Sequence, residues 1–352
     1  ARLRTAEPVS WVPALDGWLI TRHDLAIAVM GDAAHFTVDD PRFSTAQVIG
    51  PSMLSLDGQE HAHHRLPFVA PFRPVAVSRD LTEPVRNQVA RLIDELRPRG
   101  GMELRRQFAG PLAAGVIAHA LGLGQDEIGN LLDRYDAIVA SVTSISAGQG
   151  PTREGAEAFS ALRDRLDRAV SPSLLTADQV AANAAVLLFG GIETTEGMIS
   201  NAALELLKEP AWLDLIRQNT TAVDAALDES LRLEPAAAVI DRYATTDRLL
   251  GGAEIARGEL VRISITAANR DPAVFADPDR FNPARPNLRR HLAFAQGPHV
   301  CLGVHLARLE ARLALGGLIE RLPGLRLHPD EQPRVEGLVF RKPRRLAVQW
   351  DA

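Results

Sequence analysis

The residue of this chain with the clearest capacity for chemistry is its single cysteine, Cys301. One thiol among 352 residues cannot form an intramolecular disulfide or a multi-cysteine metal site. A lone cysteine is most often a buried structural residue. A thiolate can also be the axial ligand of an iron atom. Gly297 and Gly303 would let the backbone near Cys301 approach a flat macrocycle closely.

The residues after Cys301 have the spacing of an amphipathic helix. The apolar stripe of that helix would consist of Leu302, Leu306, Leu309 and Leu313. We expect the charged residues Arg308, Glu310 and Arg312 to face away from this stripe. Cys301 would then lie at a helix N-terminus, where free N–H groups and the helix dipole lower the pKa of a thiol.

A longer helical pattern begins near residue 176 and runs to about Leu207. Thr176 and Gln179 form a plausible capping box at its start. About thirty residues of helix span roughly 45 Å, enough to cross a whole domain. Residues 184–192 are apolar on every side, which predicts that the middle of this helix is buried.

Two adjacent glycines, Gly190 and Gly191, interrupt this buried helix. Glycine is less favourable than alanine in a helix by about 1 kcal/mol, and glycine pairs mark kinks. A kink with a missing side chain would open a slot, and Glu193 and Thr194 just after it could order water and relay protons. The alternative is close helix packing through the glycines, with Glu193 and Thr194 as incidental polar groups.

Two further sets of polar residues have helical spacing. His61 and Arg65 are four residues apart, so they share one face of a helix. Glu229 and Arg232 are three residues apart, a pattern that is weak evidence by itself. A metal site is an alternative for the first set, whose candidate ligands are Glu60, His61, His63 and His64. A third interpretation is a solvated polar helix start.

The order and spacing of these motifs resemble the cytochrome P450 superfamily of haem-thiolate monooxygenases. The ligand loop of that family reads Phe-Gly-x-Gly-x-His/Arg-x-Cys-x-Gly. Residues 294–303 match it except at Ala295, where the family usually has glycine. Residues 190–195 are similar to the family signature Ala/Gly-Gly-x-Asp/Glu-Thr-Thr. The resemblance covers nearly the whole chain and implies one mainly α domain, residues 1–352, with a minor β region.

The resemblance also implies roles for single residues. Cys301 would be the axial thiolate ligand of haem b, and Glu193 and Thr194 would be the acid and alcohol that deliver protons. The haem propionates would be held by His61, Arg65, Arg242 and His299. The loop that holds Cys301, residues 294–303, is called the cysteine loop below. A structural triad that holds this loop in place would consist of Glu229, Arg232 and Arg285.

The substrate pocket is expected beside the long helix, with a mostly apolar lining that has few aromatic residues. Its predicted lining consists of Asn183, Leu187, Gly190, Gly191, Val239, Ile240, Leu338 and Val339. Such a lining suits a terpenoid, polyketide, macrolide or fatty-acyl substrate equally well.

The resemblance implies insertion of one atom of dioxygen into an apolar organic substrate, by hydroxylation or epoxidation. The chain shows no flavin or iron–sulfur motif, so electrons are expected from a ferredoxin and its reductase. Two alternatives remain: a peroxygenase or isomerase that needs no external electrons, and a haem protein that binds a ligand without turnover. The Glu193–Thr194 pair argues against both a peroxide-using enzyme and a pure ligand-binding protein.

Composition is that of an ordinary globular protein, with 46% hydrophobic and 24% charged residues. A net charge of −5 gives no reason to expect nucleic-acid binding. No run of apolar residues is long enough to predict a membrane span. The first residues do not resemble a signal peptide, so we expect a cytoplasmic protein. We also expect this protein to be a monomer.

Short strands are expected at residues 17–20, 243–251, 260–266 and 338–350, a helix at 23–30, and an ordered loop at 271–286. One gap stands out, because the helix that ends near Ala169 meets the Thr176 cap almost at once. Family members usually have another helix and linker here. We interpret this as a segment missing from the sequence near residues 170–171, rather than as a true deletion.

Overall fold

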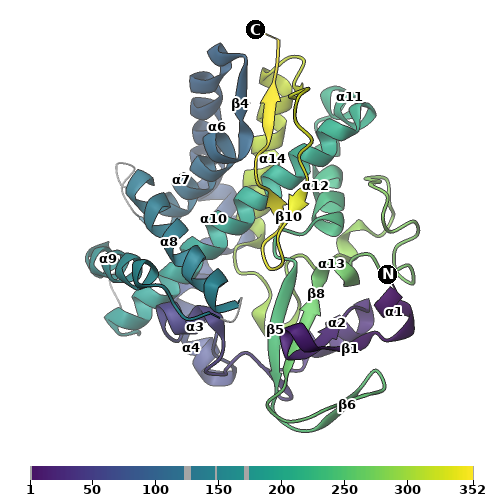
Figure 1. Ribbon diagram of the computed structural model, residues 1–352. Coiled ribbons are helices and arrows are strands. Elements are labelled where there is room, and N and C mark those ends of the chain that lie inside the picture. Colours follow the sequence, from purple (N-terminus) through teal and green to yellow (C-terminus); the bar gives the residue numbers. More distant parts are fainter. Residues whose placement is uncertain (1, 123–127, 147–148, 170–173, 352) are drawn as a thin grey trace.

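The computed structural model describes residues 2–122, 128–146, 149–169 and 174–351. Helices make up most of it, and the strands gather mainly on one side (Figure 1). The helices are α1 (Arg2–Ala6), α2 (His23–Gly31), α3 (Ser44–Ile49), α4 (Gly58–Val69), α5 (Pro74–Ala76), α6 (Thr82–Leu96), α7 (Gly110–Ala120), α8 (Ile128–Ser146), α9 (Arg153–Ala169), α10 (Ala177–Lys208), α11 (Pro210–Gln218), α12 (Ala222–Leu233), α13 (Ile265–Ala268) and α14 (Val304–Arg321).

The largest sheet has five strands in the order β1-β2-β8-β5-β3. Its strands are β1 (Val9–Val12), β2 (Gly17–Ile20), β8 (Leu260–Ser264), β5 (Val239–Ala244) and β3 (Phe36–Thr37). Strand β2 pairs with β8 in parallel, and the other neighbours are antiparallel. An apolar core, which includes Val9, Ile20, Val29 and Ile263, lies between this sheet and α2.

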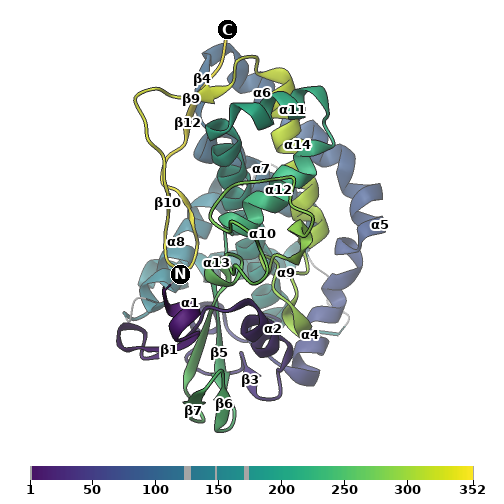
Figure 2. The ribbon, with the colours of Figure 1, turned by 90° about the vertical axis from the view of Figure 1, so that its right-hand side faces the viewer.

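Smaller sheets complete the β structure. One has the order β4-β12-β9, and two are hairpins, of which β6–β7 projects from one end of the molecule (Figure 2). Their strands are β4 (Gly101–Glu103), β6 (Arg248–Leu250), β7 (Ala253–Ile255), β9 (Arg326–Leu327), β10 (Val335–Glu336), β11 (Lys342–Pro343) and β12 (Ala347–Gln349).

Helix α10 runs through the middle of the other helices (Figure 1) and packs against α7, α9, α12 and α14. The predicted capping box is confirmed: Thr176 Oγ1 accepts from the Gln179 amide at 3.3 Å, and Gln179 Oε1 accepts from the Thr176 amide at 2.9 Å. The predicted buried middle is also confirmed, because side chains on every side of the helix are shielded from solvent. The helix stays unbroken through Gly190 and Gly191.

The strand predictions are only partly confirmed. Strand β2 and helix α2 form where expected, and residues 271–286 form a loop. The strand expected at 260–266 ends at Ser264, because the Ser264 hydroxyl accepts from the Ala267 amide and so caps α13. The strands expected at 243–251 and 338–350 are each divided into shorter pieces. The missing segment inferred near residues 170–171 lies outside the described residues.

A fully buried ion-pair network joins α12 to the loop that follows α13. The guanidinium of Arg232 binds both carboxylate oxygens of Glu229, at 2.7 and 2.8 Å. Arg285 Nε donates to Glu229 Oε1 at 2.9 Å. Neither Glu229 nor Arg232 exposes any of its side chain. The three residues predicted to form a structural triad are therefore joined through the Glu229 carboxylate.

Hydrogen bonds continue from this network toward the cysteine loop. Arg232 Nη1 donates to the Asn269 carbonyl at 3.0 Å, and Asn269 Oδ1 accepts from the Leu292 amide at 2.7 Å. The Cys301 amide in turn donates to the Phe294 carbonyl at 2.9 Å. The network thus fixes both the loop after α13 and the start of the segment that ends at Cys301.

We predict that Glu229→Ala yields little folded protein, because two buried guanidinium groups lose their carboxylate partner. Breaking a buried pair commonly costs about 3–5 kcal/mol. The matched control is Asp224→Ala on the same helix, whose half-exposed pair with Arg312 contributes about 0–1 kcal/mol. Denaturant unfolding followed by circular dichroism measures both. A Glu229→Ala protein as stable as the Asp224→Ala protein would contradict the assigned role.

Candidate functional site

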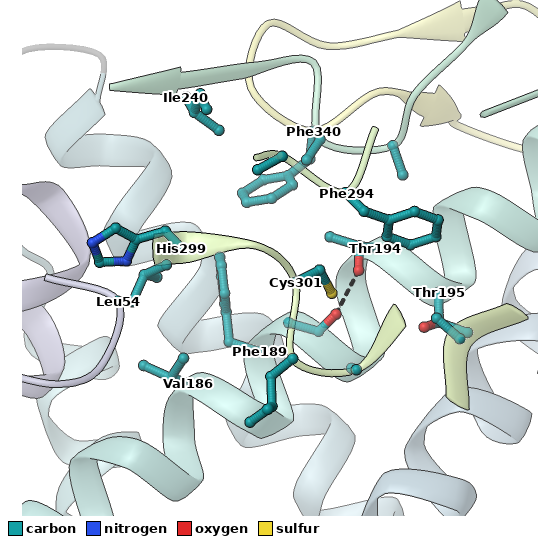
Figure 3. A pocket seen from close by; sticks show the side chains of 18 of the residues that line it. Leu54, Val186, Phe189, Thr194, Thr195, Ile240, Phe294, His299, Cys301 and Phe340 are labelled. Carbon is teal, nitrogen blue, oxygen red and sulfur yellow. Dashed lines mark hydrogen bonds between the residues drawn. The ribbon is translucent and has the colours of Figure 1, made fainter. Parts of the chain in front are cut away.

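A cavity of about 350 Å³ lies between α10, the cysteine loop and the start of β5. Cys301, Thr194 and Gly190 all line it. Figure 3 shows Cys301 on its loop and Thr194 on α10, both at this cavity. The wall is mostly apolar, which excludes water and suits an organic ligand. The lone thiol and the slot predicted on the long helix are therefore brought to one cavity.

The two glycines of α10 differ in what surrounds them. A Cβ on Gly191 would lie 2.9 Å from Ile117 Cγ1 of α7, so this glycine permits close packing between the helices. A Cβ on Gly190 would meet no atom within 4 Å, because this position faces the cavity. Gly190 therefore leaves open space beside the helix, whereas Gly191, which also borders the cavity, permits the close helix packing of the alternative interpretation.

Cys301 lies three residues before α14, which begins at Val304 and not at Leu302. Burial raises the pKa of the Cys301 thiol, while the Gly303 amide and the charge of Arg65 lower it. The predicted lowering of this pKa is therefore wrong for the protein alone, because burial outweighs both favourable contacts. A metal cation on Sγ would reverse the balance, since a coordinating thiol loses its proton.

The turn before Cys301 uses left-handed backbone conformations at two positions. Gly297 has φ 73°, and a Cβ there would lie 2.5 Å from the Met30 carbonyl oxygen, so only glycine fits. Ala295 has φ 58°, which is unfavourable for a residue with a side chain. The ring of Phe294 is covered by the Arg308 guanidinium, 5.6 Å from the ring centre.

Histidine and arginine side chains gather at one end of the cavity. The rings of His61 and His299 meet edge to face with centres 4.2 Å apart, and Arg65 Nη2 donates to the Val300 carbonyl at 2.7 Å. Arg65 and His299 line the cavity. His61 is buried, and its Nε2 has no hydrogen-bond partner among the described residues. Burial, followed by the charges of His299 and Arg65, lowers the pKa of His61.

Asp57 is a member of this group that the sequence did not indicate. Its carboxylate accepts from His299 Nε2 at 2.7 Å, from Thr37 Oγ1 at 2.6 Å and from the Val38 amide at 2.8 Å. Burial opposes ionisation of Asp57, but these hydrogen bonds outweigh it and hold its pKa well below the usual range. Arg242 is buried close enough for its charge to interact with that of Asp57.

The alternative of a metal site around His61 is not supported. Among the described residues, no group of three or more His, Cys, Asp or Glu side chains is arranged to hold a metal ion. His64 instead contacts the Asn183 amide nitrogen at 3.0 Å, and His63 is exposed.

Thr194 and Glu193 point in different directions from α10. Thr194 Oγ1 donates to the Gly190 carbonyl at 2.5 Å and faces the cavity (Figure 3). Glu193 is not among the described residues that line the cavity. Its Oε1 lies 2.7 Å from Lys342 Nζ, on another side of the helix. The acid and the alcohol are adjacent in sequence, but only the alcohol reaches the cavity.

Sequence and structure comparisons agree with this architecture. Residues 143–348 match the family model described as Cytochrome P450. The 20-oxo-5-O-mycaminosyltylactone 23-monooxygenase of Streptomyces fradiae is 35% identical over 94% of this chain and 83% of its own length. The mycinamicin IV hydroxylase/epoxidase of Micromonospora griseorubida is 33% identical over 99% of this chain and 94% of its own length.

The chain belongs to the cytochrome P450 superfamily. The solved structure of P450BioI in complex with an acyl carrier protein ligated to hexadec-9Z-enoic acid has a TM-score of 0.88 to this fold. That match has 28% identity and covers 99% of this chain and 97% of that chain. As a cytochrome P450, the protein is a monooxygenase that hydroxylates or epoxidises an organic substrate. No described helix of this cytochrome P450 is both long and apolar enough to span a membrane.

The predicted substrate pocket of this cytochrome P450 needs two corrections. Six of the predicted residues line the cavity: Leu187, Gly190, Gly191, Val239, Ile240 and Val339. Asn183 does not, because its buried amide accepts from the Met53 amide and donates to the Gln179 carbonyl, both at 2.7 Å. Leu338 is 60% exposed in the turn between β10 and β11.

The cavity is also more aromatic than the sequence suggested. Its aromatic lining consists of Phe43, Phe72, Phe189, Phe294 and Phe340. Phe189 and Phe340 meet edge to face with ring centres 5.2 Å apart. These residues come from separate segments, so their convergence depends on the fold and not on any local pattern.

Glu310 is a second carboxylate of the site, and the orientation predicted for it is wrong. It was expected to face away from the apolar stripe of α14, but it is 3% exposed and lines the cavity. It lies one turn after Leu306 and so shares its face, and α14 is packed by α6, α10 and α12. Glu310 Oε2 has no hydrogen-bond partner among the residues described. Burial raises the pKa of Glu310 well above its usual range.

We predict that Ala295→Gly raises the free energy of unfolding by about 0.5–1 kcal/mol. A left-handed conformation costs a residue with a side chain about 1–2 kcal/mol, and the greater chain entropy of glycine offsets part of the gain. Ala293→Gly is the matched control and should destabilise the protein, since Ala293 has no left-handed backbone. Equal destabilisation by both changes in a denaturant titration would contradict the strain at Ala295.

We also predict that Glu310→Gln changes how stability depends on pH. The folded-state pKa of Glu310 lies above its unfolded value, so on raising the pH the unfolded chain releases this proton first. The free energy of unfolding of the wild type therefore falls between the unfolded pKa, about 4.3, and the raised folded pKa. Glu310→Gln should remove that fall and gain stability relative to the wild type at neutral pH.

The measurement for Glu310 is the denaturant midpoint of the haem-loaded protein at several pH values. Glu320→Gln, at an exposed position of the same helix, is the control and should follow the wild-type profile. Parallel profiles for the wild type and Glu310→Gln would show that Glu310 is ionised in the folded protein.

Proposed function

We propose that the Cys301 thiolate is the axial ligand of haem b, bound in the cavity against α10. The observation that carries this proposal is that the one thiol of the chain lines the same cavity as Gly190 and Thr194. The missing side chain at Gly190 leaves room beside the helix for a flat group. When bound, haem supplies the activation of dioxygen.

The polar end of the cavity supports haem b as the cofactor. Two carboxylates brought into a buried site need charged or hydrogen-bonding partners. Arg65 and Arg242 are cationic, and His61 Nε2 is a buried polar atom that lacks a partner among the described residues. His299 would complete the set of propionate-binding residues, although it is already hydrogen-bonded to Asp57. These residue types fit the propionates of haem.

The residues of the chain have separate tasks in this proposal. The Gly303 amide and the Arg65 guanidinium stabilise negative charge on Cys301 Sγ. Thr194 Oγ1 holds a proton at the cavity wall and can donate it into the cavity, and Glu193 replaces that proton from the far side of α10. Delivery of protons at this wall favours formation of water over release of peroxide.

We propose an apolar organic substrate of the terpenoid, polyketide, macrolide or fatty-acyl class. The support is the aliphatic and aromatic lining, which excludes water and offers few polar groups for orientation. The two relatives are named for 20-oxo-5-O-mycaminosyltylactone and for mycinamicin IV, and the solved P450BioI complex holds hexadec-9Z-enoic acid on its carrier protein.

The remaining reactants follow from the chemistry of the reaction. Dioxygen is the oxidant, and a ferredoxin with its reductase supplies the electrons, since the described chain offers no second cysteine to hold a cluster. We place the enzyme in the cytoplasm as a monomer. A peroxide-driven reaction is the alternative, and product formation with peroxide against product formation with reduced ferredoxin separates the two.

We predict that Thr194→Ala uncouples the reaction. The variant should bind substrate and accept electrons as the wild type does, but consume reductant while releasing more peroxide and less product. Thr194→Ser, which keeps the hydroxyl, is the matched control and should retain most of the coupling. The measurement is product formed per reductant consumed, with a compound that the wild type hydroxylates. Wild-type coupling in Thr194→Ala would place the proton route elsewhere.

A further inference from the structure

An ion-pair cluster lies on the side of α10 that carries Glu193. Lys342 Nζ is 2.7 Å from Glu193 Oε1 and also contacts the carboxylate of Glu196, one turn later on the helix. The two glutamate side chains are only 7% and 3% exposed. Arg105 Nη1 lies 3.4 Å from Glu196 Oε1. The lysine ammonium is thus shared by two buried carboxylates, of which one is the proposed proton-delivering acid.

The backbone next to Lys342 is held close to α10 by hydrogen bonds and packing. The carbonyl of Arg341 accepts from Asn201 Nδ2 of α10 at 2.9 Å, and the Arg341 amide donates to the Ala236 carbonyl at 2.9 Å. A Cβ on Gly197 would lie 2.9 Å from Ala236 Cβ and 3.7 Å from Lys342 Cβ, so this glycine permits the close approach. The position of the ammonium is therefore set by the backbone and not only by a flexible side chain.

The same segment also reaches the cavity. Phe340, two residues before Lys342, lines the cavity and packs edge to face on Phe189 of α10. Phe189 and Glu193 are one turn apart on α10, so Phe340 and Lys342 contact successive turns of this helix. The segment from Phe340 to Lys342 thus spans the wall between the cavity and the buried acid.

We propose that Lys342 is a positioning residue for the reaction, which holds the Glu193 carboxylate in place on the side of α10 away from the cavity. The proposal rests on the proposed role of Glu193 and Thr194 in proton delivery. A carboxylate this deeply buried is stabilised in its ionised form by an ammonium in contact with it. Without Lys342, the Glu193 carboxylate loses the ammonium that contacts it and is less well placed to pass protons from outside to Thr194.

Glu196 is the second carboxylate that contacts the Lys342 ammonium. It holds the ammonium from the side opposite Glu193 and has Arg105 as a further cation. Glu196 thus contacts two cations, of which Lys342 is shared with Glu193.

The functional test needs no substrate. With a ferredoxin, its reductase and air-saturated buffer, reduction of dioxygen to peroxide uses two electrons and two protons, and reduction to water uses four of each. Peroxide released per reductant consumed therefore reports proton delivery. We expect Lys342→Met to raise this ratio by roughly two-fold or more, and Glu193→Gln to do the same.

Three comparisons make the result specific to the ion pair. The double variant Lys342→Met with Glu193→Gln should show no further rise, because residues that act as one unit are not additive. Lys342→Arg, which keeps the charge, should restore most of the wild-type ratio. Lys208→Met removes the other lysine of the chain, a half-exposed partner of Glu205 on α10, and should leave the ratio unchanged.

A second measurement is independent of turnover. In denaturant unfolding, the shifts in midpoint caused by Lys342→Met and Glu193→Gln should be non-additive in the double variant, as expected for side chains in contact. If Lys342→Met does not fold, Lys342→Gln takes its place, since its amide can still hydrogen-bond to both carboxylates.

The proposal is overturned if Lys342→Met keeps the wild-type peroxide ratio, or if its effect and that of Glu193→Gln multiply in the double variant. Additive midpoint shifts would show that the side chains of Lys342 and Glu193 do not interact. A wild-type protein that consumes no reductant would instead refute the proposed function, and the unfolding cycle would still decide whether Lys342 and Glu193 interact.

Discussion

The carboxylate of Glu229 has to be neutralised in the interior, and the arrangement of the site depends on how this is achieved. Arg232 and Arg285 bind it from two segments, and their remaining donors hold carbonyl groups of the loop after α13. That loop leads through Asn269 and Leu292 to the turn that ends at Cys301. A buried charge outside the cavity lining thus fixes the position of the thiol, because its partners cannot separate without leaving charges unpaired.

Helix α10 provides another wall of the cavity, and its faces have different roles. Gly191 brings it close to α7, Gly190 leaves open space on the cavity side, and Thr194 places a hydroxyl there. Glu193 and Glu196 face the segment that carries Lys342. A helix that is buried all round can keep such polar groups only where each has a partner, which explains why the ion pairs and the cavity lie on different sides.

Features set by local spacing could be predicted from the sequence, and features set by packing could not. The capping box of α10, the Glu229–Arg232 pair and the surroundings of Cys301 depend on residues close in the chain or on a motif with fixed order. Asn183 and Glu310 were misplaced because helical periodicity does not show which neighbours cover a face. Asp57 and the aromatic lining were missed because their partners come from distant segments.

The central claim is that Cys301 supplies a thiolate to haem iron in this cavity. The most direct measurement is the absorption spectrum of the reduced, carbon monoxide-bound protein, compared between the wild type and Cys301→His. The account predicts the strongly red-shifted Soret band of a thiolate ligand in the wild type and its loss in Cys301→His, in protein that still binds haem. The same red-shifted band in Cys301→His would contradict the account.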